Sequence, residues 1–363
     1  MIEKIRDPEK MTFEEDDSFE LPPPDIVAYN EARSCADLYR MYKDKILEIR
    51  PKFQREVVWK NAAQTRFIDS LIRQLPIPSM CFSLDYKTQK WQVIDGLQRM
   101  WSIIQFLSNK SWELAKLDDI NPKISGKKVA EFRNKKNAVL YPLYSSVKNL
   151  SLPITVIRCD SSKMSHTEFL FKIFHRLNSG AERLNNQEIR NCIYGGSFNN
   201  LLKELEKEHS WMVINKMKKE KGYRYAKQEV ILRFFAFHDI WNEYDGRLGK
   251  FLNNYMQIHR NPPEIFLREK KDLFNRTVKI VYGTIFDGKM PSKLSISILE
   301  GVLVGISLNL DFIDRQTPVQ IKAMYEKLRH KRIFSEKMLR EGLASKEKVK
   351  NRMLTAKKVF SGK

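Results

Sequence analysis

Residues 91–99 read WQVIDGLQR, and this stretch predicts a strand, a sharp turn and the start of a helix. The apolar run before Asp95 is typical of a strand, and the Asp95-Gly96 pair is typical of the turn that ends one. From Leu97 to Leu107 the apolar side chains then recur at helical spacing. The sequence therefore predicts that a strand delivers Asp95 to the beginning of a helix.

A helix that begins at residue 97 offers unpaired backbone N–H groups and the positive end of its dipole, which together favour a phosphate. Gly96 allows the backbone to approach a ligand closely, and Arg99 offers a planar fork of donors to phosphate oxygens. Asp95 is suited to hold a metal ion or to accept a proton from water. An Asp-Gly turn before a helix with a surface arginine is also a common structural feature. Taken alone, these residues favour a structural role over a functional one.

Strand patterns at 80–84 and 152–159 accompany the central strand, and helical patterns lie between them. After His166, the apolar side chains recur at helical spacing to the end of the chain. The fold class is therefore predicted as α+β, with a mixed α/β part at residues 30–160 and an all-helical part at residues 165–363.

Charge is distributed unevenly along the chain. Residues 1–25 contain nine acids and three bases, and we expect them to form a flexible acidic arm. The whole chain nevertheless has a formal net charge of +21 and a pI near 9.6. Such a basic body is expected to attract polyanions, with DNA first among them. Solvated surface charge without a partner is the alternative.

Residues 216–227 interleave tyrosines with basic side chains, a pattern that suits phosphate contact and base stacking. The tail at 331–363, with eleven bases and three acids, is a second basic stretch. Both stretches are also explained as solvated helix faces. The candidate nucleic-acid contacts in the first stretch are Lys216, Lys218, Lys219, Lys221, Tyr223, Arg224, Tyr225 and Lys227.

The order of the motifs closely resembles the N-terminal domain of the GmrSD-type restriction family, whose fold is ParB/sulfiredoxin-like. In that family a Gln-Arg pair follows the first strand, and a Pro-Ile-Pro turn precedes an Asp-Gly-Gln-Gln-Arg signature. The resemblance covers roughly residues 35–260. The motifs of this chain that carry it are Gln54-Arg55, Pro76-Ile77-Pro78, Asp95-Gly96-Leu97-Gln98-Arg99, Phe174-His175-Arg176-Leu177-Asn178-Ser179-Gly180 and Leu184-Asn185-Asn186-Gln187-Glu188-Ile189-Arg190.

The resemblance implies binding of a nucleoside triphosphate (NTP), with or without Mg²⁺, and hydrolysis in some members. Carried over by position, the implied site consists of Asp95, Gly96, Gln98 and Arg99, with Gln54 and Arg55 as neighbours. The implied catalytic residues are Asp95, Gln98 and Arg99.

One departure from the family pattern is Leu97, where the family usually has glutamine. Leucine cannot make a hydrogen bond through its side chain. If the glutamine orients water or phosphate, this protein binds nucleotide but turns it over slowly or not at all. If the glutamine only caps a helix, the substitution changes nothing.

The second family block also has a structural explanation. Asn185 and Glu188 have the spacing of a capping box at the start of a helix, and capping accounts for both residues. Capping does not account for Arg176, Gln187 or Arg190. We therefore expect these side chains to close over the nucleotide from the helical part, and we include Asn178 among the nucleotide-binding candidates.

Other classes of site find little support in the sequence. The six histidines show no zinc spacing, no HNH-type nuclease motif is present, and we predict no metal-binding residues. Residues 283–290 approach the Walker A pattern, but Met290 stands where Ser or Thr should bind Mg²⁺. The four cysteines lie far apart and are expected to be free thiols. No apolar run is long enough to cross a membrane, so a cytoplasmic location is expected.

We therefore expect a nucleotide-binding, DNA-associated protein of an anti-phage or restriction-type system, acting as a sensor or regulatory subunit. NTP hydrolysis is left open, as is assembly into a homo-oligomer, and a separate nuclease or effector subunit is an expected partner. Two alternatives remain at this point. One is a ParB-like nuclease that cleaves DNA itself, and the other is a non-catalytic DNA-binding or assembly module.

Overall fold

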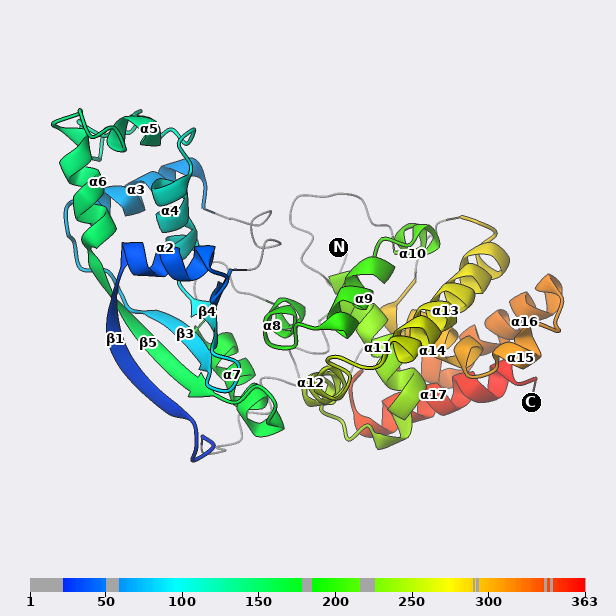
Figure 1. Cartoon of the computed structure of the whole chain (residues 1–363). Helices are drawn as coiled ribbons and strands as arrows, with labels where there is room; N and C mark the ends of the chain where they lie inside the picture. The colour runs from blue at the N-terminus through cyan, green and yellow to red at the C-terminus, as the bar shows by residue number, and fades with distance from the viewer. Residues whose placement is uncertain are drawn as a thin grey trace. The chain divides into compact units, whose positions relative to one another are not determined.

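The computed structural model describes residues 22–49, 59–177, 185–215, 226–289, 291, 294–335, 338–339 and 342–362. These residues divide into two compact units, 22–177 and 185–362. The first unit contains a sheet with helices, and the second is built from helices (Figure 1). The predicted class, a mixed α/β part followed by a helical part, is therefore confirmed. Helix α7 (Met164–Leu177), which the sequence pattern groups with the helical part, belongs to the sheet unit.

The sheet has five strands in the order β1-β5-β3-β4-β2. Antiparallel pairs join β1 to β5 and β3 to β4, whereas β3 and β5 are parallel, as are β2 and β4. Every residue of the central strand β3 is buried. The strands are β1 (Val27–Ser34), β2 (Leu47–Glu48), β3 (Met80–Asp85), β4 (Lys90–Asp95) and β5 (Ser151–Cys159).

Alternating side chains of the strands enter two packed layers. Met80 and Phe82 of β3 join the main core on one face, where helices of this unit pack over the sheet. On the other face lies α7, which contacts β4 and buries Phe171 and Phe174. The helices on the side of the first face are α2 (Cys35–Lys43), α3 (Asn61–Ile72), α4 (Leu97–Ser108) and α6 (Leu140–Asn149), and the short α5 (Val129–Phe132) contacts α6 (Figure 1).

The helical unit is organised around two apolar helices, α11 and α14, which contact each other. Phe234 and Phe235 of α11 are fully buried. The helices of this unit are α8 (Asn186–Ile193), α9 (Ser197–Leu205), α10 (His209–Ile214), α11 (Ala226–Ile240), α12 (Leu248–Ile258), α13 (Glu264–Ile280), α14 (Ile296–Ser307), α15 (Leu310–Ile313), α16 (Pro318–Arg329) and α17 (Lys346–Phe360), with short turns η2 (Trp241–Glu243), η3 (Val281–Ile285) and η4 (Arg332–Phe334).

Helix α14 packs against α17 through two glycines. A Cβ built on Gly301 would lie 2.8 Å from Cζ of Phe334, and one on Gly305 would lie 2.6 Å from Cδ2 of Phe360. The absence of side chains at these two positions lets α17 and η4 approach the core helix. Among the described helices, none combines the length and the apolar character that a bilayer crossing needs.

The Walker-like stretch at 283–290 begins inside a helical turn. Gly283 lies in η3, a π-helical turn that continues directly from α13. A phosphate-binding loop of the Walker type follows a strand and precedes a helix. The helical context of Gly283 therefore agrees with the rejection of a Walker A site.

Candidate nucleotide site

Gly96 joins the end of β4 to the start of α4 in a left-handed backbone conformation. Its φ is 94° and its ψ is 16°, a region that residues with side chains rarely adopt. A Cβ built on Gly96 would also lie 2.5 Å from Cγ of Met80. Both constraints make glycine a requirement of the fold itself. The close approach at Gly96 that the structure shows is the one to Met80.

The first turn of α4 has no side-chain cap among the described residues. The first bond within the helix runs from the Met100 N–H to the Gly96 carbonyl oxygen at 2.8 Å. The N–H groups of residues 97–99 precede this bond and point out of the helix start. These donors and the positive end of the helix dipole make the turn favourable for an anion.

Leu97, the departure from the family signature, is half-buried and packs against the hydrophobic core of the sheet unit. Its side chain is therefore accounted for by apolar contacts. The backbone N–H of the same residue remains at the helix start, so the substitution leaves the backbone donors of the turn in place.

Arg99 folds back from the first turn of α4 onto Asp95 at the end of β4. Its Nη2 lies 2.7 Å from Asp95 Oδ2. The same guanidinium donates to the backbone carbonyl oxygens of Pro78, through Nη1, and of Ser79, through Nη2 at 3.5 Å. The Arg99 side chain is 15% exposed and the Asp95 side chain is 38% exposed. The two predicted site residues therefore meet at a partly exposed position, and three acceptors orient the arginine.

Gln98 connects the helix start to the segment that enters α3. Its Oε1 accepts a long hydrogen bond from the Trp59 N–H at 3.4 Å. Trp59 directly follows residues 50–58, and β2, which precedes them, runs parallel to β4. Both flanks of this segment are therefore anchored beside β4 and the helix start. Gln54 and Arg55 themselves lie outside the described residues.

A row of polar side chains continues from Asp95 across one face of the sheet. In strand register Asp95 lies opposite Cys81, which lies opposite Thr155. Thr155 lies opposite Asn30, and its hydroxyl donates to Asn30 Oδ1 at 2.8 Å. Ser79 Oγ lies 3.0 Å from Thr155 Oγ1. Residues opposite each other in neighbouring strands share a face, so this row extends the site toward β1.

No local pattern in the sequence marks Ser79, Thr155 or Asn30 as site residues, because strand register brings them together. Cys81 lies in the middle of the row. Burial and the neighbouring Asp95 raise the pKa of the Cys81 thiol to about 12. The thiol is therefore protonated at neutral pH and is no nucleophile.

The second family block divides between the two units. Arg176 is exposed in the last turn of α7, the helix that contacts β4. Asn178 lies outside the described residues. The predicted capping box is confirmed, since the Glu188 N–H donates to Asn185 Oδ1 at 2.9 Å and the Asn185 N–H donates to Glu188 Oε2 at 2.6 Å.

Gln187 and Arg190 lie inside the helical unit. Their exposed fractions are 1% and 0%. Arg190 donates through Nε to Asn253 Oδ1 at 2.8 Å and through Nη1 to Glu229 Oε2 at 3.2 Å. These contacts explain the buried guanidinium without a ligand, and we do not include the two residues in the proposed site. The physical reason is that burial leaves no surface through which a phosphate could reach them.

Most of the predicted nucleic-acid segment lies outside the described residues, namely Lys216, Lys218, Lys219, Lys221, Tyr223, Arg224 and Tyr225. Lys227 is described and lies half-exposed near the start of α11.

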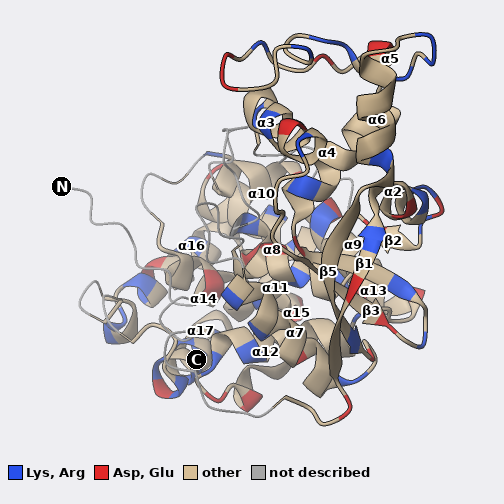
Figure 2. Ribbon diagram, turned by 90° about the vertical axis from the view of Figure 1, so that its left-hand side faces the viewer, with Lys and Arg blue, Asp and Glu red and all other residues tan. Residues whose placement is uncertain are grey.

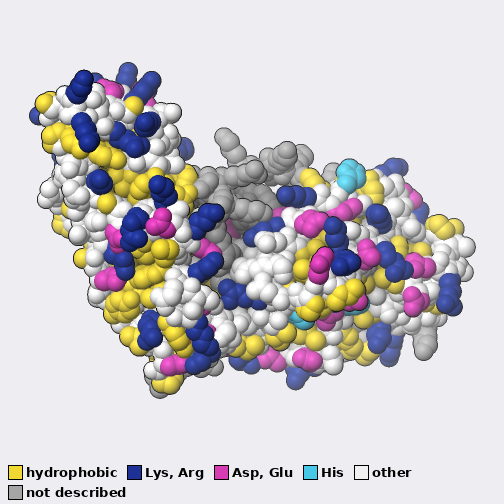
Figure 3. Space-filling model, in the orientation of Figure 1, with side chains coloured by type: hydrophobic (Ala, Val, Ile, Leu, Met, Phe, Trp, Pro, Cys, Tyr) yellow, Lys and Arg dark blue, Asp and Glu magenta, His cyan; other side chains and the backbone are white. Residues whose placement is uncertain are grey.

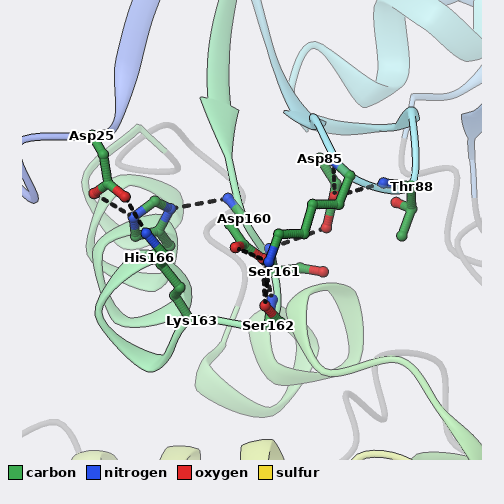
Figure 4. A network of polar contacts seen from close by, with 9 residues as sticks. Asp25, Asp85, Thr88, Asp160, Ser161, Ser162, Lys163 and His166 are labelled. Carbon is green, nitrogen blue, oxygen red and sulfur yellow. Dashed lines mark hydrogen bonds and ion pairs between the residues drawn. The ribbon is translucent and has the colours of Figure 1, made fainter.

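A separate polar network ties the residues before β1 to the start of α7 (Figure 4). The buried His166 accepts the Asp160 N–H at Nδ1, over 2.9 Å, and its Nε2 lies 2.7 Å from Asp25 Oδ1. Because the backbone donor occupies Nδ1, the imidazole proton sits on Nε2 and is donated to Asp25. Lys163 also pairs with Asp25. Every polar atom of the imidazole is used within the fold, so the network has a structural role.

Asp160 stabilises the same end of the unit. Burial raises the pKa of Asp160, but Lys87, at 2.8 Å, and Ser162 together lower it well below the usual range. Asp85 accepts the N–H groups of Lys87 and Thr88, each at 2.9 Å, and so holds the turn between β3 and β4. In the parts of the chain that the structure describes, no group of three or more His, Cys, Asp and Glu could hold a metal ion.

Residues 35–195 match the family described as the GmrSD restriction endonuclease, N-terminal domain. No curated protein matches the chain. The matched region includes the Asp95–Arg99 turn and continues through α8, whereas β1 and its Asn30 lie before it.

Proposed function

From the match of residues 35–195 to the family described as the GmrSD restriction endonuclease, N-terminal domain, we propose that the turn between β4 and α4 binds an NTP. The match supports a role of the chain in a restriction or anti-phage system. The proposed role is that of a sensor or regulatory subunit that associates with DNA, while a separate subunit supplies cleavage. The net charge of +21 supports the association with DNA. Lys and Arg side chains are spread over the visible surface of both units (Figure 3).

The observation that carries the proposal is the coincidence of three features at one turn. Among the described residues no side chain caps the start of α4, Arg99 lies in its first turn, and Asp95 stands beside the arginine. Phosphate oxygens are suited to the backbone donors and to the guanidinium. Asp95 is suited to Mg²⁺ that accompanies a triphosphate. The phosphates of an NTP are attracted to Arg99 and the accompanying Mg²⁺ to Asp95, so the bound NTP and its cation complement the charges of this pair.

Whether the site hydrolyses NTP depends on side chains that can orient water. Leu97 packs against the core and offers no polar group. Asp95 and Gln98 are the polar side chains of the turn that remain for this task. We therefore expect binding with slow hydrolysis or none.

A non-catalytic module is the second candidate function. Two observations favour it: Gly96 is required by its φ and by Met80, and Arg99 braces the backbone at Pro78. On this alternative the signature preserves the junction of strand and helix and binds no ligand. A nuclease that uses Asp95 alone is less well supported, because two-metal cleavage needs several carboxylates.

Calorimetry with each NTP, with and without Mg²⁺, tests the proposal. Arg99→Ala is expected to weaken binding by roughly 10- to 100-fold, because a hydrogen bond to a charged group contributes about 1.5–3 kcal/mol. Arg99→Lys keeps the charge but loses the planar fork, and an intermediate affinity is expected.

Arg73→Ala is the matched control. Arg73, the C-cap residue of α3, also pairs with the acid four positions before it, with its Nε 2.9 Å from Asp69 Oδ2, and its loss should leave NTP affinity unchanged. Thermal unfolding of each variant shows whether a loss of binding reflects a loss of fold. If no NTP binds the folded wild-type protein in the presence of Mg²⁺, the proposal is wrong and the non-catalytic module takes its place.

A further inference from the structure

Helix α17 and the adjoining turn η4 carry a basic surface that the nucleotide site does not use. Lys and Arg residues recur along α17, and η4 contacts this helix. Figure 2 shows Lys and Arg segments on helices of both units. The surface, called here the α17 surface, consists of Lys331, Arg332, Lys346, Lys350, Lys357 and Lys358. All of these side chains are exposed except that of Lys350, which is half-exposed.

The cations of the α17 surface lack acidic partners within the described part of the chain. The one acid on α17 is Glu347. Helix α13 of the same unit shows the opposite pattern, since Lys270, Lys271 and Arg276 each pair with a carboxylate. Unpaired cations on a surface leave a positive potential available to an external anion.

Three lysines of α17 form a line along the helix. Lys350 and Lys357 follow Lys346 by four and eleven residues. At about 100° per residue, the directions of the three side chains around the helix axis therefore fall within roughly 40° of one another. The line is about 16 Å long. Duplex DNA presents roughly ten phosphate charges over that length, because one charge occurs per about 1.7 Å of its axis. The spacing therefore suits a repeated polyanion better than a single small anion.

Helix stability does not account for all of these lysines. Lys357 and Lys358 lie in the last turn, where they complement the negative end of the helix dipole. Lys346 lies at the first position of the helix, where a positive charge opposes the dipole by about 0.3–1 kcal/mol. Ser345 before it makes no side-chain cap bond. A lysine at this position thus acts against the helix, which points to a role outside folding.

We propose that the α17 surface binds duplex DNA through its phosphates, without reading base sequence. Proteins that bind single strands use exposed aromatic side chains for stacking. The aromatic residues nearest the surface, Phe334 and Phe360, are buried. The proposal rests on the association with DNA proposed above and does not depend on nucleotide binding.

The test compares two triple variants that remove the same net charge. The test variant is Lys346→Gln, Lys350→Gln and Lys357→Gln on α17. The control is Arg268→Gln, Lys271→Gln and Arg276→Gln on α13, where each cation has an acidic partner. Fluorescence anisotropy with a labelled duplex of arbitrary sequence is measured over a series of salt concentrations.

The α17 variant is expected to bind at least about tenfold more weakly. The slope of log K against log salt should fall by up to about 2.7, or 0.9 for each lost phosphate contact. The control should stay close to the wild type. Equal losses in both variants would mean that net charge alone attracts DNA, and the proposed surface would be wrong. Equal or tighter binding of single strands, or of anionic vesicles, would also overturn the duplex assignment.

Two further measurements distinguish DNA binding at the α17 surface from unfolding of the variant and from NTP binding at the other site. The melting temperature of Lys346→Gln should equal or exceed that of the wild type, because the substitution removes a charge that opposes the dipole. Weaker DNA binding by this variant therefore cannot come from unfolding. NTP calorimetry on the triple α17 variant should match the wild type, so failure at one site does not imply failure at the other.

Discussion

Gly96 is subject to two constraints, its positive φ and the space occupied by Met80, and they can be separated. Gly96→Ala is expected to lower the free energy of unfolding by about 2–4 kcal/mol, from backbone strain and overpacking together. Urea unfolding followed by circular dichroism measures this change.

The same substitution in a Met80→Ala background isolates the steric part. Removing the Met80 side chain opens the space that the new Cβ would enter, so only the strain of φ should remain. The cost of Gly96→Ala should then fall to about 1–2 kcal/mol. An unchanged cost would show that the contact with Met80 is irrelevant.

Asp25 makes the stability of the sheet unit depend on pH. Its hydrogen bonds to Lys163 and His166 lower the pKa of Asp25 from 3.8 to about 2. A depressed pKa means that the contribution is fully present above pH 3.8 and is lost as the pH falls through about 2. Asp25→Asn should therefore melt below the wild type at pH 6, and the difference should disappear near pH 2. A difference that stays constant over this range would contradict the pairing.

At the scale of helices, Gly305 and Gly283 make a matched pair, because the first is tightly packed and the second faces open space. A Cβ on Gly305 of α14 would lie 2.9 Å from the Ala356 carbonyl oxygen, whereas a Cβ on Gly283 of η3 meets nothing within 4 Å. Gly305→Ala should cost about 1–3 kcal/mol by pushing α17 away. Gly283→Ala should stabilise the protein by about 0.5–1 kcal/mol through backbone entropy. Urea unfolding of both variants checks the opposite signs.

The elements that the sequence predicts are those with a strong local pattern. The strand and helix around Asp95 were predicted because apolar periodicity changes abruptly there, and the capping box at Asn185 because its spacing is local. Strand β1 was not predicted. Most of its residues are exposed, so its sequence carries no burial pattern.

Contacts between distant residues could not be predicted in this way. The partner of Asp25 is His166, and the partner of Thr155 is Asn30. Only the pairing of β1 with β5 brings Thr155 and Asn30 together. The burial of Arg190 could not be predicted either, because the spacing of the residues in this motif does not reveal that the side chain points into packed helices. Burial, which decides between ligand binding and packing, is a property of the whole unit.

At the scale of the whole molecule, the two proposed activities, NTP binding and DNA binding, belong to different units, and each unit has its own core. The proposed NTP site lies within the sheet unit, and the α17 surface lies within the helical unit. Each unit is large enough to unfold as a cooperative body. Calorimetric scanning is therefore expected to resolve two transitions.

Substitutions and ligands should each move one of these transitions. Gly96→Ala should lower that of the sheet unit and Gly305→Ala that of the helical unit, by roughly 2–4 °C per kcal/mol. Saturating NTP with Mg²⁺, at about 100 times its dissociation constant, should stabilise only the sheet unit, by about 2.7 kcal/mol. Duplex DNA should raise only the transition that Gly305→Ala lowers. If either ligand moves the transition assigned to the other unit, that ligand binds elsewhere, because a ligand stabilises the unit whose folded state it binds.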